Sequence, residues 1–369
     1  MASMKLAMVV PGGVDRSGAD RVIPALLSLV RRLAAQHELH VFALAQEPVP
    51  GSWMLEGAVI HNVGNARAIG RTVAAIRREH RRAPFALVQS IWSGISGLSA
   101  VVAAKLTRLP ACVHVAGGEL AAVPVIGYGG QLHWRWQVLE RFTLRNAARV
   151  TAASEPIVAM IERFGCRARR LPLGVDLRSW PPLLPRPRVA GAAARLVHVA
   201  SLNRVKDQTT LLEAARCLVQ RGLDFHLDVI GEDTLGGAMQ ALAMRLGLAQ
   251  HVTFHGMLRH EALRPMMERA VLNIVSSLHE AGPLVTLEAA VLGVPTVGTR
   301  VGHIAEWDGF AATAVSPGDA AGLAAGIEAL LVDEPRRRQL ALAAQARAVA
   351  EDADYTAARF LALYDEVTH

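Results

Sequence analysis

Cysteine, lysine and aromatic residues are all scarce in this chain of 369 residues. The three cysteines, Cys112, Cys166 and Cys217, lack the spacing of a metal or redox motif, which fits structural thiols in a reducing compartment. Aromatic residues make up 5%, which weighs against a stacking surface for single-stranded nucleic acid, so we expect no nucleic-acid partner. No apolar segment has the form of a signal peptide. We therefore expect a cytoplasmic protein, either soluble or peripheral on the inner face of the membrane.

A long uncharged run is present only over residues 83–104, which is enough to cross a hydrocarbon layer of about 30 Å. The run is nevertheless rich in glycine, serine and glutamine. It divides into a strand over 86–90, a Trp-Ser-Gly turn and a helix packed through small residues. The sequence therefore predicts a buried strand and helix here rather than a membrane span.

Charge is distributed unevenly between the two halves of the chain. Residues 1–180 hold 22 Lys or Arg against 11 Asp or Glu, whereas residues 181–369 hold 17 against 21. The basic half indicates an anionic partner, such as a membrane surface, a phosphorylated lipid or an acidic glycan. The alternative is a solvated basic surface with no partner.

Short apolar runs alternate with amphipathic stretches along the chain, a pattern typical of α/β proteins with parallel sheets. A stretch with four prolines, residues 179–194, separates two such series. The sequence predicts a Rossmann-like domain over 1–180, a linker over 181–194 and a second Rossmann-like domain over 195–354. We expect a final helix over 355–369 that packs on one of these two domains, with the first domain as the candidate partner. Because ligands of open α/β sheets bind at the carboxyl ends of the strands, we expect the domains to face each other across a cleft.

The first strand is followed by a glycine-containing loop, "PGGVDRSGADR". Gly12 and Gly13 allow backbone amides to approach a ligand closely, and the next helix would present its amino terminus to an anion. The dinucleotide pattern G-x-G-x-x-G is not met. A ligand-binding loop and a plain strand–helix turn both remain open at this point.

The second series opens with "VASLNRVKDQTTLLEAA", in which Arg204 and Lys206 precede a helix. Cations beside free helix amides can hold a phosphate. The chain has only three lysines, at positions 5, 105 and 206, beside 36 arginines. The compact ammonium of Lys206 therefore indicates a phosphate ligand, although chance placement is the alternative.

Two glutamates interrupt the apolar segment "SLHEAGPLVTLEAAVLGVPTVGT". Glu280 lies in the loop after a predicted buried strand, and Glu288 lies in the helix that starts near Pro283-Leu284. Burying a carboxylate without a partner is costly, so hydroxyls of a ligand would explain both acids. The alternative is a helix-start acid and an internal salt bridge.

These segments, in this order, resemble the GT-B glycosyltransferases of family 4, the retaining group 1 enzymes with an E-x7-E region. "SSLHEAGPLVTLEAAVLGVPTVGTRVGHIAE" is similar to that region and the Gly-x-Pro strand after it. "PGGVDRSGADR" is similar to the family's glycine loop, and "LPLGVDLRSW" to its Gly-Val-Asp turn. "VASLNRVKDQTTLLEAA" resembles the phosphate-binding turn, and "HVTFHGML" the strand beside the base pocket. The resemblance covers most of the chain and implies a GT-B fold with two Rossmann-like domains.

The resemblance implies catalytic roles for Glu280, Lys206 and Arg204: Glu280 would bind the donor sugar, and the two cations would neutralise the leaving diphosphate. It also implies donor contacts, with Glu288 on the ribose and further contacts from Gly282, Leu284, Leu258, Gly12 and Gly13. The implied acceptor contacts are Asp20, His114 and Glu119. No metal ion and no cofactor are expected.

Two positions depart from the family pattern. Ser201 stands where many members have an arginine, so Arg204 would have to substitute for it. Ala116 stands where many have a histidine, leaving His114 or Glu119 as the polar group nearby.

The function implied is a metal-independent, retaining transfer of a sugar from a nucleoside-diphosphate sugar to a glycan, lipid-linked or small-molecule acceptor. The alternatives are a non-catalytic nucleotide-sugar-binding protein and a nucleotide-sugar epimerase. The expected partners are the donor, the acceptor and an anionic membrane surface. Trp134 and Trp136 would stack on sugar rings, touch lipid or cap the core.

Overall fold

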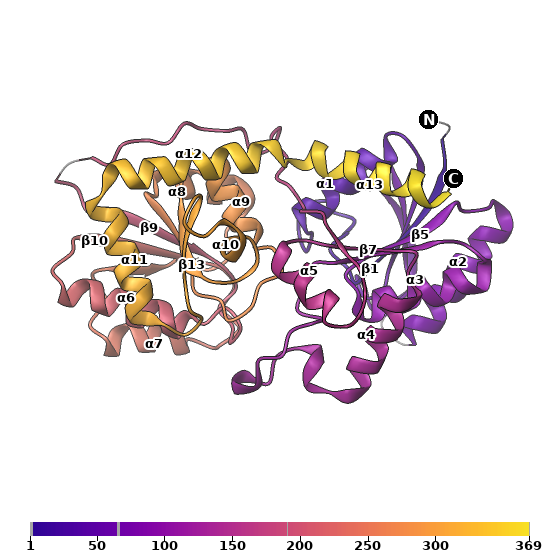
Figure 1. The fold of residues 1–369 in the computed structure, drawn as a ribbon, viewed down its shortest axis with the longest axis horizontal. Coiled ribbons are helices and arrows are strands. Elements are labelled where there is room, and N and C mark those ends of the chain that lie inside the picture. Colours follow the sequence, from indigo (N-terminus) through magenta and orange to yellow (C-terminus); the bar gives the residue numbers. More distant parts are fainter. Residues whose placement is uncertain (1–2, 65–66, 190, 369) are drawn as a thin grey trace. The chain divides into compact units, whose positions relative to one another are not determined.

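The structure is a computed structural model that describes residues 3–64, 67–189 and 191–368. The chain forms two compact units, one from Met1–Asp176 with Glu351–His369 and the other from Leu177–Ala350. In each unit, helices cover a central sheet (Figure 1). The α/β class with two Rossmann-like units is therefore confirmed.

Unit 1 contains an eight-stranded sheet in the order β3-β4-β2-β1-β5-β6-β7-β8. Its strands are β1 (Lys5–Val10), β2 (Glu38–Ala43), β3 (Gly51–Leu55), β4 (Ala58–Asn62), β5 (Leu87–Ile91), β6 (Ala111–Val115), β7 (Arg149–Ala152) and β8 (Arg169–Arg170). Its helices are α1 (Pro24–Ala34), α2 (Ala68–Arg82), α3 (Gly94–Thr107), α4 (Trp134–Asn146), α5 (Glu155–Glu162) and α13 (Ala353–Thr368), with short 3-10 turns η1 (Pro124–Ile126) and η2 (Gly130–Leu132).

The central strands of this sheet are buried along nearly their whole length. β5 and β6 are buried at every position, because helices cover both faces of a parallel sheet. The exception to parallel pairing is the β3–β4 hairpin at the edge of the sheet. The sequence pattern did not predict this hairpin, whose β3 alternates between half-buried and exposed residues.

Unit 2 contains a six-stranded parallel sheet in the order β11-β10-β9-β12-β13-β14. Its strands are β9 (Ala194–Val199), β10 (Phe225–Ile230), β11 (Val252–Phe254), β12 (Leu272–Val275), β13 (Thr296–Thr299) and β14 (Ala312–Val315). Its helices are α6 (Gln208–Gln220), α7 (Ala238–Arg245), α8 (His260–Arg269), α9 (Leu284–Val291), α10 (Gly302–Trp307), α11 (Ala320–Val332) and α12 (Glu334–Ala350). Aliphatic side chains of β9, β10 and β12 form its core with those of α6 and α11.

The last helix, α13, packs on α1 within unit 1. Arg32 Nε donates to Asp354 Oδ1 at 2.5 Å, and the Thr356 hydroxyl accepts from Gly174 N at 2.8 Å. A Cβ at Gly174 would lie 2.2 Å from the carbonyl oxygen of Glu351, so only glycine fits this approach of two backbones. The Gly-Val-Asp turn, residues 174–176, therefore packs against the start of helix α13.

The predicted linker over 181–194 falls within unit 2; its last residue, Ala194, begins β9, and residue 190 lies outside the described residues. Leu183 N donates to Val291 O at 3.1 Å, and Arg188 Nη1 donates to Leu331 O at 2.8 Å. These contacts place this extended stretch along the surface of one unit.

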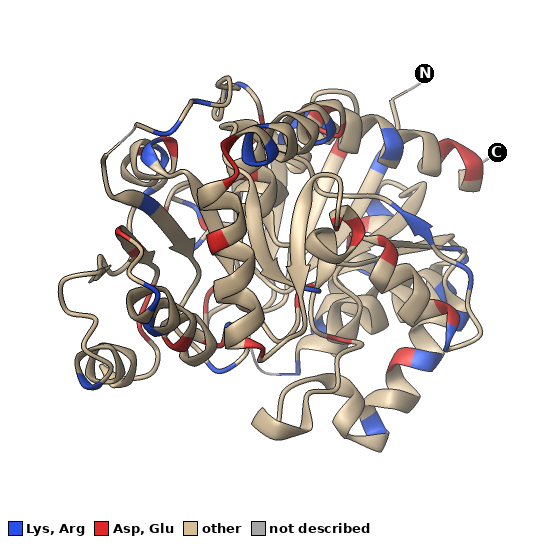
Figure 2. Cartoon of the chain, turned by 60° about the vertical axis from the view of Figure 1, so that its left-hand side comes forward, with Lys and Arg blue, Asp and Glu red and all other residues tan. Residues whose placement is uncertain are grey.

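The uncharged run over 83–104 forms strand β5 and most of helix α3, which confirms the predicted buried strand and helix. Within the described residues, no helix combines the length and apolar character needed to span a membrane. Figure 2 shows that Lys and Arg residues are spread over helices, strands and loops rather than confined to one element.

Candidate functional site

The candidate site in unit 2 forms where two neighbouring strands end. β9 and β12 pair side by side in the sheet, so the turn after β9 and the loop after β12 meet at its carboxyl edge. The Ser276 hydroxyl donates to Lys206 O at 2.8 Å, and Leu278 N donates to Val205 O, also at 2.8 Å. The two loops are therefore held together by hydrogen bonds near Lys206.

Lys206 and Glu280 form a direct ion pair between these loops. The ammonium of Lys206 donates to Glu280 Oε1, and the Ser277 hydroxyl donates to the same oxygen at 2.7 Å. The side chains are 26% and 14% exposed, so solvent screens the pair only in part. An ammonium has three donors, which leaves Lys206 able to hold an anion while it contacts Glu280.

A cavity of about 260 Å³ opens beside this pair. Its lining includes the side chains of Lys206 and Glu280 and, at the start of α9, residues Gly282, Pro283 and Leu284. Backbone amides at a helix start carry partial positive charge and bind anions, although Pro283 has no amide to offer. The structure thus brings together four of the predicted site residues around one space.

His198 also lines the cavity and was missed by the sequence reasoning. Its Nδ1 donates to Ile274 O at 2.9 Å, and its Nε2 accepts from the amide of Gln208 at 3.2 Å. The same amide donates to Ser201 O at 3.2 Å, which ties the histidine to the β9–α6 turn. Burial lowers the pKa of His198 to about 4, so the ring is neutral at pH 7. A histidine inside the apolar run "RLVHVAS" was the available signal.

Glu288 lies one turn after Leu284 in α9 and does not line this cavity. Its Oε1 is 3.9 Å from His260 Nε2, and its backbone oxygen accepts from Trp180 Nε1 at 2.9 Å. The rings of Trp180 and His260 are 4.3 Å apart between centroids. Glu288 is therefore held beside an aromatic pair.

Arg204 and Leu258 lie in loops of the same unit. Arg204 is exposed in the β9–α6 turn, two residues before Lys206, and Leu258 is half-buried in the segment after β11. Neither residue lines the cavity beside Lys206.

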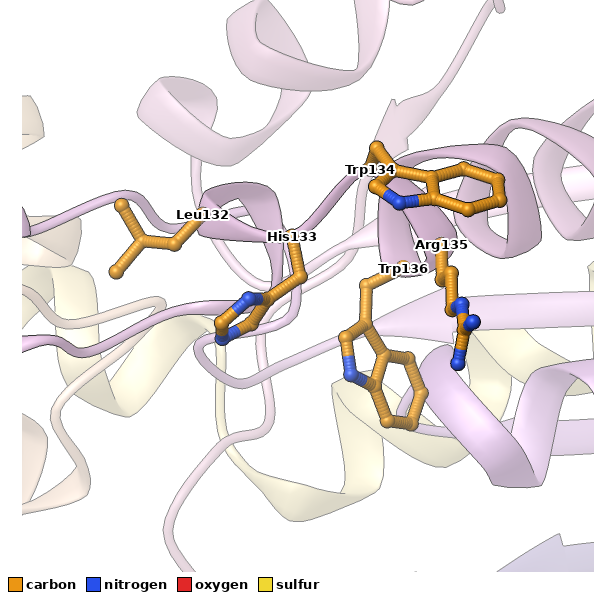
Figure 3. A pocket seen from close by; sticks show the side chains of 5 residues that line it. All are labelled: Leu132, His133, Trp134, Arg135 and Trp136. Carbon is orange, nitrogen blue, oxygen red and sulfur yellow. The ribbon is translucent and has the colours of Figure 1, made fainter.

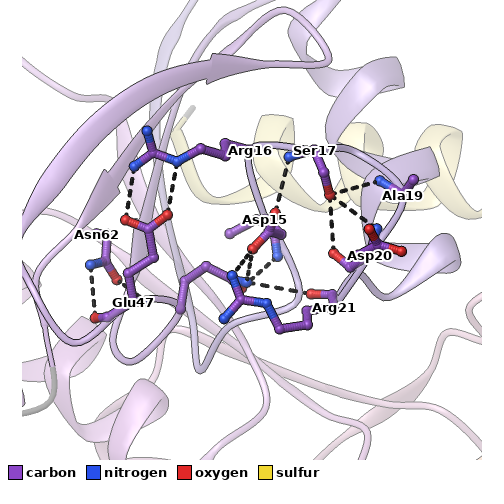
Figure 4. A network of polar contacts seen from close by, with 10 residues as sticks. Asp15, Arg16, Ser17, Ala19, Asp20, Arg21, Glu47 and Asn62 are labelled. Carbon is purple, nitrogen blue, oxygen red and sulfur yellow. Dashed lines mark hydrogen bonds and ion pairs between the residues drawn. The ribbon is translucent and has the colours of Figure 1, made fainter.

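In unit 1, the buried Asp15 organises the loop after β1, in which the predicted Asp20 also lies (Figure 4). The buried Asp15 carboxylate accepts from Ser17 N at 3.0 Å and from the Gln46 amide at 3.2 Å, and it pairs with Arg21. The hydrogen bond from Ser17 is the main cause that lowers the pKa of Asp15. Asp20 is exposed, with its backbone nitrogen donating to the Ser17 hydroxyl at 3.0 Å.

The packing of the loop itself, apart from the expected contact with a ligand, favours glycine at both of these positions. Gly13 has a φ of +81°, and a Cβ there would lie 2.7 Å from Ile23 Cδ1. Gly12 lies against Gln46, where a Cβ would be 3.3 Å from Oε1. The loop therefore needs Gly13 for its own backbone conformation.

His114 lies in the core of unit 1. Its Nδ1 is 3.0 Å from the Thr151 hydroxyl, its ring packs edge-on against Phe360 of α13, and burial lowers its pKa to about 3. The strand places it under the last helix rather than at the sheet edge.

Glu119, in the loop after β6, and Glu140 of α4 accept hydrogen bonds from two successive backbone amides at the start of α3. Glu119 accepts from Ser93 N at 3.0 Å and from Gly117 N at 2.9 Å, while Glu140 Oε1 accepts from Gly94 N at 2.7 Å. Burial, helped by the charge of Glu119, raises the pKa of Glu140 to about 7, and burial also raises the pKa of Glu119. Glu140 was missed by the sequence reasoning, because its helix pattern does not reveal a buried acid.

No group of three or more His, Cys, Asp or Glu side chains with metal-binding geometry occurs among the described residues.

Two family descriptions match the chain. "Glycosyl transferase 4-like domain" matches residues 22–175, and "Glycosyl transferases group 1" matches residues 193–333.

Curated relatives align over part or most of the chain. Glycogen synthase of Mycobacterium tuberculosis is 30% identical over 176 residues, which are 47% of this chain and 42% of that protein. The chain thus spans less than half of the length of that relative. D-inositol 3-phosphate glycosyltransferase of Arthrobacter is 26% identical over 364 residues, with 90% of this chain and 86% of that protein covered.

Solved structures share the fold over nearly the whole chain. Sucrose-phosphate synthase of Thermosynechococcus elongatus has a TM-score of 0.81 and 18% identity, with 98% of each chain covered. HepE of Anabaena, solved in complex with UDP-glucose, has a TM-score of 0.75 and 17% identity, covering 98% of this chain and all of that one (100%). The two family domains in order, together with this fold, show that the chain belongs to the group 1, family 4 type of GT-B glycosyltransferases.

Proposed function

We propose that the protein is a retaining glycosyltransferase that moves a sugar from a nucleoside-diphosphate sugar to a glycan, lipid-linked or small-molecule acceptor. The observation that carries the proposal is the Lys206–Glu280 pair beside the start of α9, at the edge of one cavity. A cation and helix amides suit a diphosphate, and a carboxylate suits sugar hydroxyls. The binding of UDP-glucose by HepE, a protein of the same fold, supports a donor of this class.

In this mechanism, Lys206 and the amides of Gly282 and Leu284 stabilise the negative charge that develops on the leaving diphosphate. The bond between the anomeric carbon and the diphosphate oxygen breaks, and a bond from the same face to the acceptor oxygen forms. The acceptor's proton moves to the leaving diphosphate, so no side chain need act as a strong base. Glu280 orients the sugar through its hydroxyls, and Glu288 holds the ribose hydroxyls.

Charge stabilisation by Lys206 and the helix amides replaces the role that a divalent cation has in other transferases. We therefore propose that transfer needs no metal ion and no cofactor. Turnover should be equal with a chelator and with added magnesium, and a strict requirement for a divalent cation would contradict this part.

The function is tested by donor turnover over a panel of nucleoside-diphosphate sugars and acceptors. Separate replacements of Lys206, Glu280 and Glu288 by alanine should each lower turnover. Removing one stabilising donor costs about 10²–10³ in kcat for a comparable charge-stabilising site, and we expect that scale for Lys206→Ala. Lys105→Ala, at an exposed lysine of α3, is the matched control and should keep full turnover.

Other outcomes distinguish the competing functions. Unchanged turnover in all three variants would contradict the proposal that this site transfers a sugar. Donor binding without transfer or hydrolysis would indicate a non-catalytic binding protein. A changed sugar in the recovered donor, without any acceptor, would indicate an epimerase.

A further inference from the structure

Helix α4 carries an exposed apolar stripe on the side away from the core of unit 1. Trp134, Val138 and Phe142 are 69%, 60% and 41% exposed and follow one another at intervals of four residues. Residues four apart lie on one side of a helix, so the three side chains form a continuous stripe. On the opposite side, Thr143 and Leu144 are buried, and α4 packs on α3.

The stripe continues into the turn before the helix. The side chains of residues 132–136 line a hollow of about 430 Å³ in which the two indoles, Trp134 and Trp136, flank Arg135 in sequence (Figure 3). The Arg135 guanidinium is 5.5 Å from the ring centroid of Trp134. The exposed residues of Trp134–Arg145 are here called the α4 surface.

All exposed charges of α4, whose residues the structure describes throughout, are positive. Arg135, Arg141 and Arg145 are exposed, whereas the helix's one acid, Glu140, is 1% exposed and binds the start of α3. Arg141 and Arg145 are seven residues after Trp134 and Val138, which puts them on the same side of the helix as the stripe. Apolar and basic side chains therefore share one exposed face.

We propose that the α4 surface binds an anionic lipid bilayer. Helices that lie in a membrane interface combine exposed tryptophan, phenylalanine and aliphatic residues with arginines that pair with lipid phosphates. A core-facing helix would bury the stripe, and a purely solvated helix would not expose three large apolar side chains in register. The positive charge selects a negatively charged surface over a neutral one.

This inference deepens the proposed function, because it places the protein at the surface where a lipid-linked acceptor would lie. It does not depend on the sugar-transfer chemistry, since vesicle binding is measured without donor or acceptor. Loss of vesicle binding with intact sugar transfer would contradict only the α4 surface. Vesicle binding without sugar transfer would contradict only the proposed function.

The test is flotation of the full chain with phosphatidylcholine vesicles that contain or lack phosphatidylglycerol. We expect binding to the anionic vesicles, weakened by salt, and little binding to the neutral ones. Combined Arg141→Gln and Arg145→Gln should weaken binding about 25-fold, because each arginine near an anionic surface changes affinity about fivefold. Combined Trp134→Ser, Val138→Ser and Phe142→Ser should abolish it.

Matched controls come from exposed residues of unit 2. Arg216→Gln with Arg245→Gln repeats the charge change, and Met244→Ser with Leu342→Ser repeats the loss of exposed apolar side chains. Both should bind vesicles like the parent protein. Thermal unfolding of every variant establishes that the fold is retained.

A local readout checks that the helix itself enters the lipid. Lipids brominated in their acyl chains should quench tryptophan fluorescence of the parent protein, and Trp134→Phe should reduce that quenching. Equal binding to neutral and anionic vesicles would overturn the proposal, as would parental binding by the folded variants. A dimer that dissociates when the stripe is replaced, without vesicle binding, would assign the surface to a second copy of the chain.

Discussion

Lys206 and Glu280 are 74 residues apart in the sequence, yet the ammonium of one donates directly to the carboxylate of the other. Their contact joins the turn after β9 to the loop after β12, two strands that are neighbours in the sheet of unit 2. The pair therefore couples the group proposed to hold phosphate with the group proposed to hold sugar.

Replacing Glu280 by glutamine should separate these two roles. The change removes the negative charge that competes for Lys206, so UDP should bind up to about fivefold more tightly, which corresponds to the ~1 kcal/mol of a partly exposed ion pair. Sugar transfer should fall, because the carboxylate that orients the donor is lost. Calorimetry of UDP binding and turnover assays measure the two effects. Glu213→Gln, on the exposed side of α6, is the control, and weaker UDP binding by Glu280→Gln would contradict the coupling.

Gln208 should stabilise the phosphate-binding turn through His198 and Ser201. Gln208→Leu removes the donor to His198 Nε2 and to Ser201 O, both buried or half-buried acceptors. Leaving such groups unsatisfied costs about 1–3 kcal/mol, so the free energy of unfolding should fall by that amount. Urea unfolding measures it.

The control for this variant is Gln250→Leu, at an exposed position. Its unfolding free energy should change by less than about 0.5 kcal/mol. Equal stability of Gln208→Leu and the parent protein would show that the hydrogen bonds of Gln208 do not stabilise the turn.

Glu140 should make stability depend on pH. Its pKa is about 7 in the folded protein against an ordinary value of 4.5, so the folded state holds the proton more tightly. The contribution of Glu140 to the free energy of unfolding is fully present below pH 4.5. It is lost as the pH rises through 7, and amounts to a total on the order of 3 kcal/mol. Glu140→Gln, which keeps an acceptor for Gly94 N, should remove this fall. Denaturant unfolding between pH 4.5 and 8 tests it, and parallel curves for parent and variant would contradict it.

Gly174 should tolerate no side chain. Alanine there would place Cβ 2.2 Å from a backbone oxygen of Glu351, so the end of the chain would have to move. We expect a loss of about 1–3 kcal/mol or more in unfolding free energy. Gly70→Ala is the matched control: it lies inside α2 with no atom within 4 Å of the added Cβ and should stabilise the helix by about 0.5–1 kcal/mol. Comparable thermal midpoints for the two variants would refute the argument.

The order of strands and helices could be predicted from the sequence because it depends on local periodicity. Buried parallel strands are continuous apolar runs, and the helices between them repeat their apolar residues at helical spacing. For this reason the sequence correctly predicted a buried strand and helix over 83–104, rather than a membrane span. The small polar residues of this uncharged run suit a packed strand and helix. The β3–β4 hairpin was missed because a short edge strand with exposed residues carries little of that pattern.

The candidate site was predictable only in part. The motifs and their order in the sequence predicted Lys206, Glu280, Gly282 and Leu284 as site residues. In the structure, all four line one cavity. Asp15, His198 and Glu140 were missed, because the surroundings of each depend on burial and on at least one hydrogen-bond partner more than 30 residues away. Desolvation and long-range hydrogen bonds are properties of the folded packing.

The sequence by itself determined the fold class and the family, because both depend on local patterns and on motifs in a fixed order. Only the tertiary structure decided that Lys206 contacts Glu280, that His114 is sealed under α13, and that the stripe on α4 is left uncovered. The physical reason is that charge pairing, burial and exposure depend on which distant segments the sheet and its helices bring side by side.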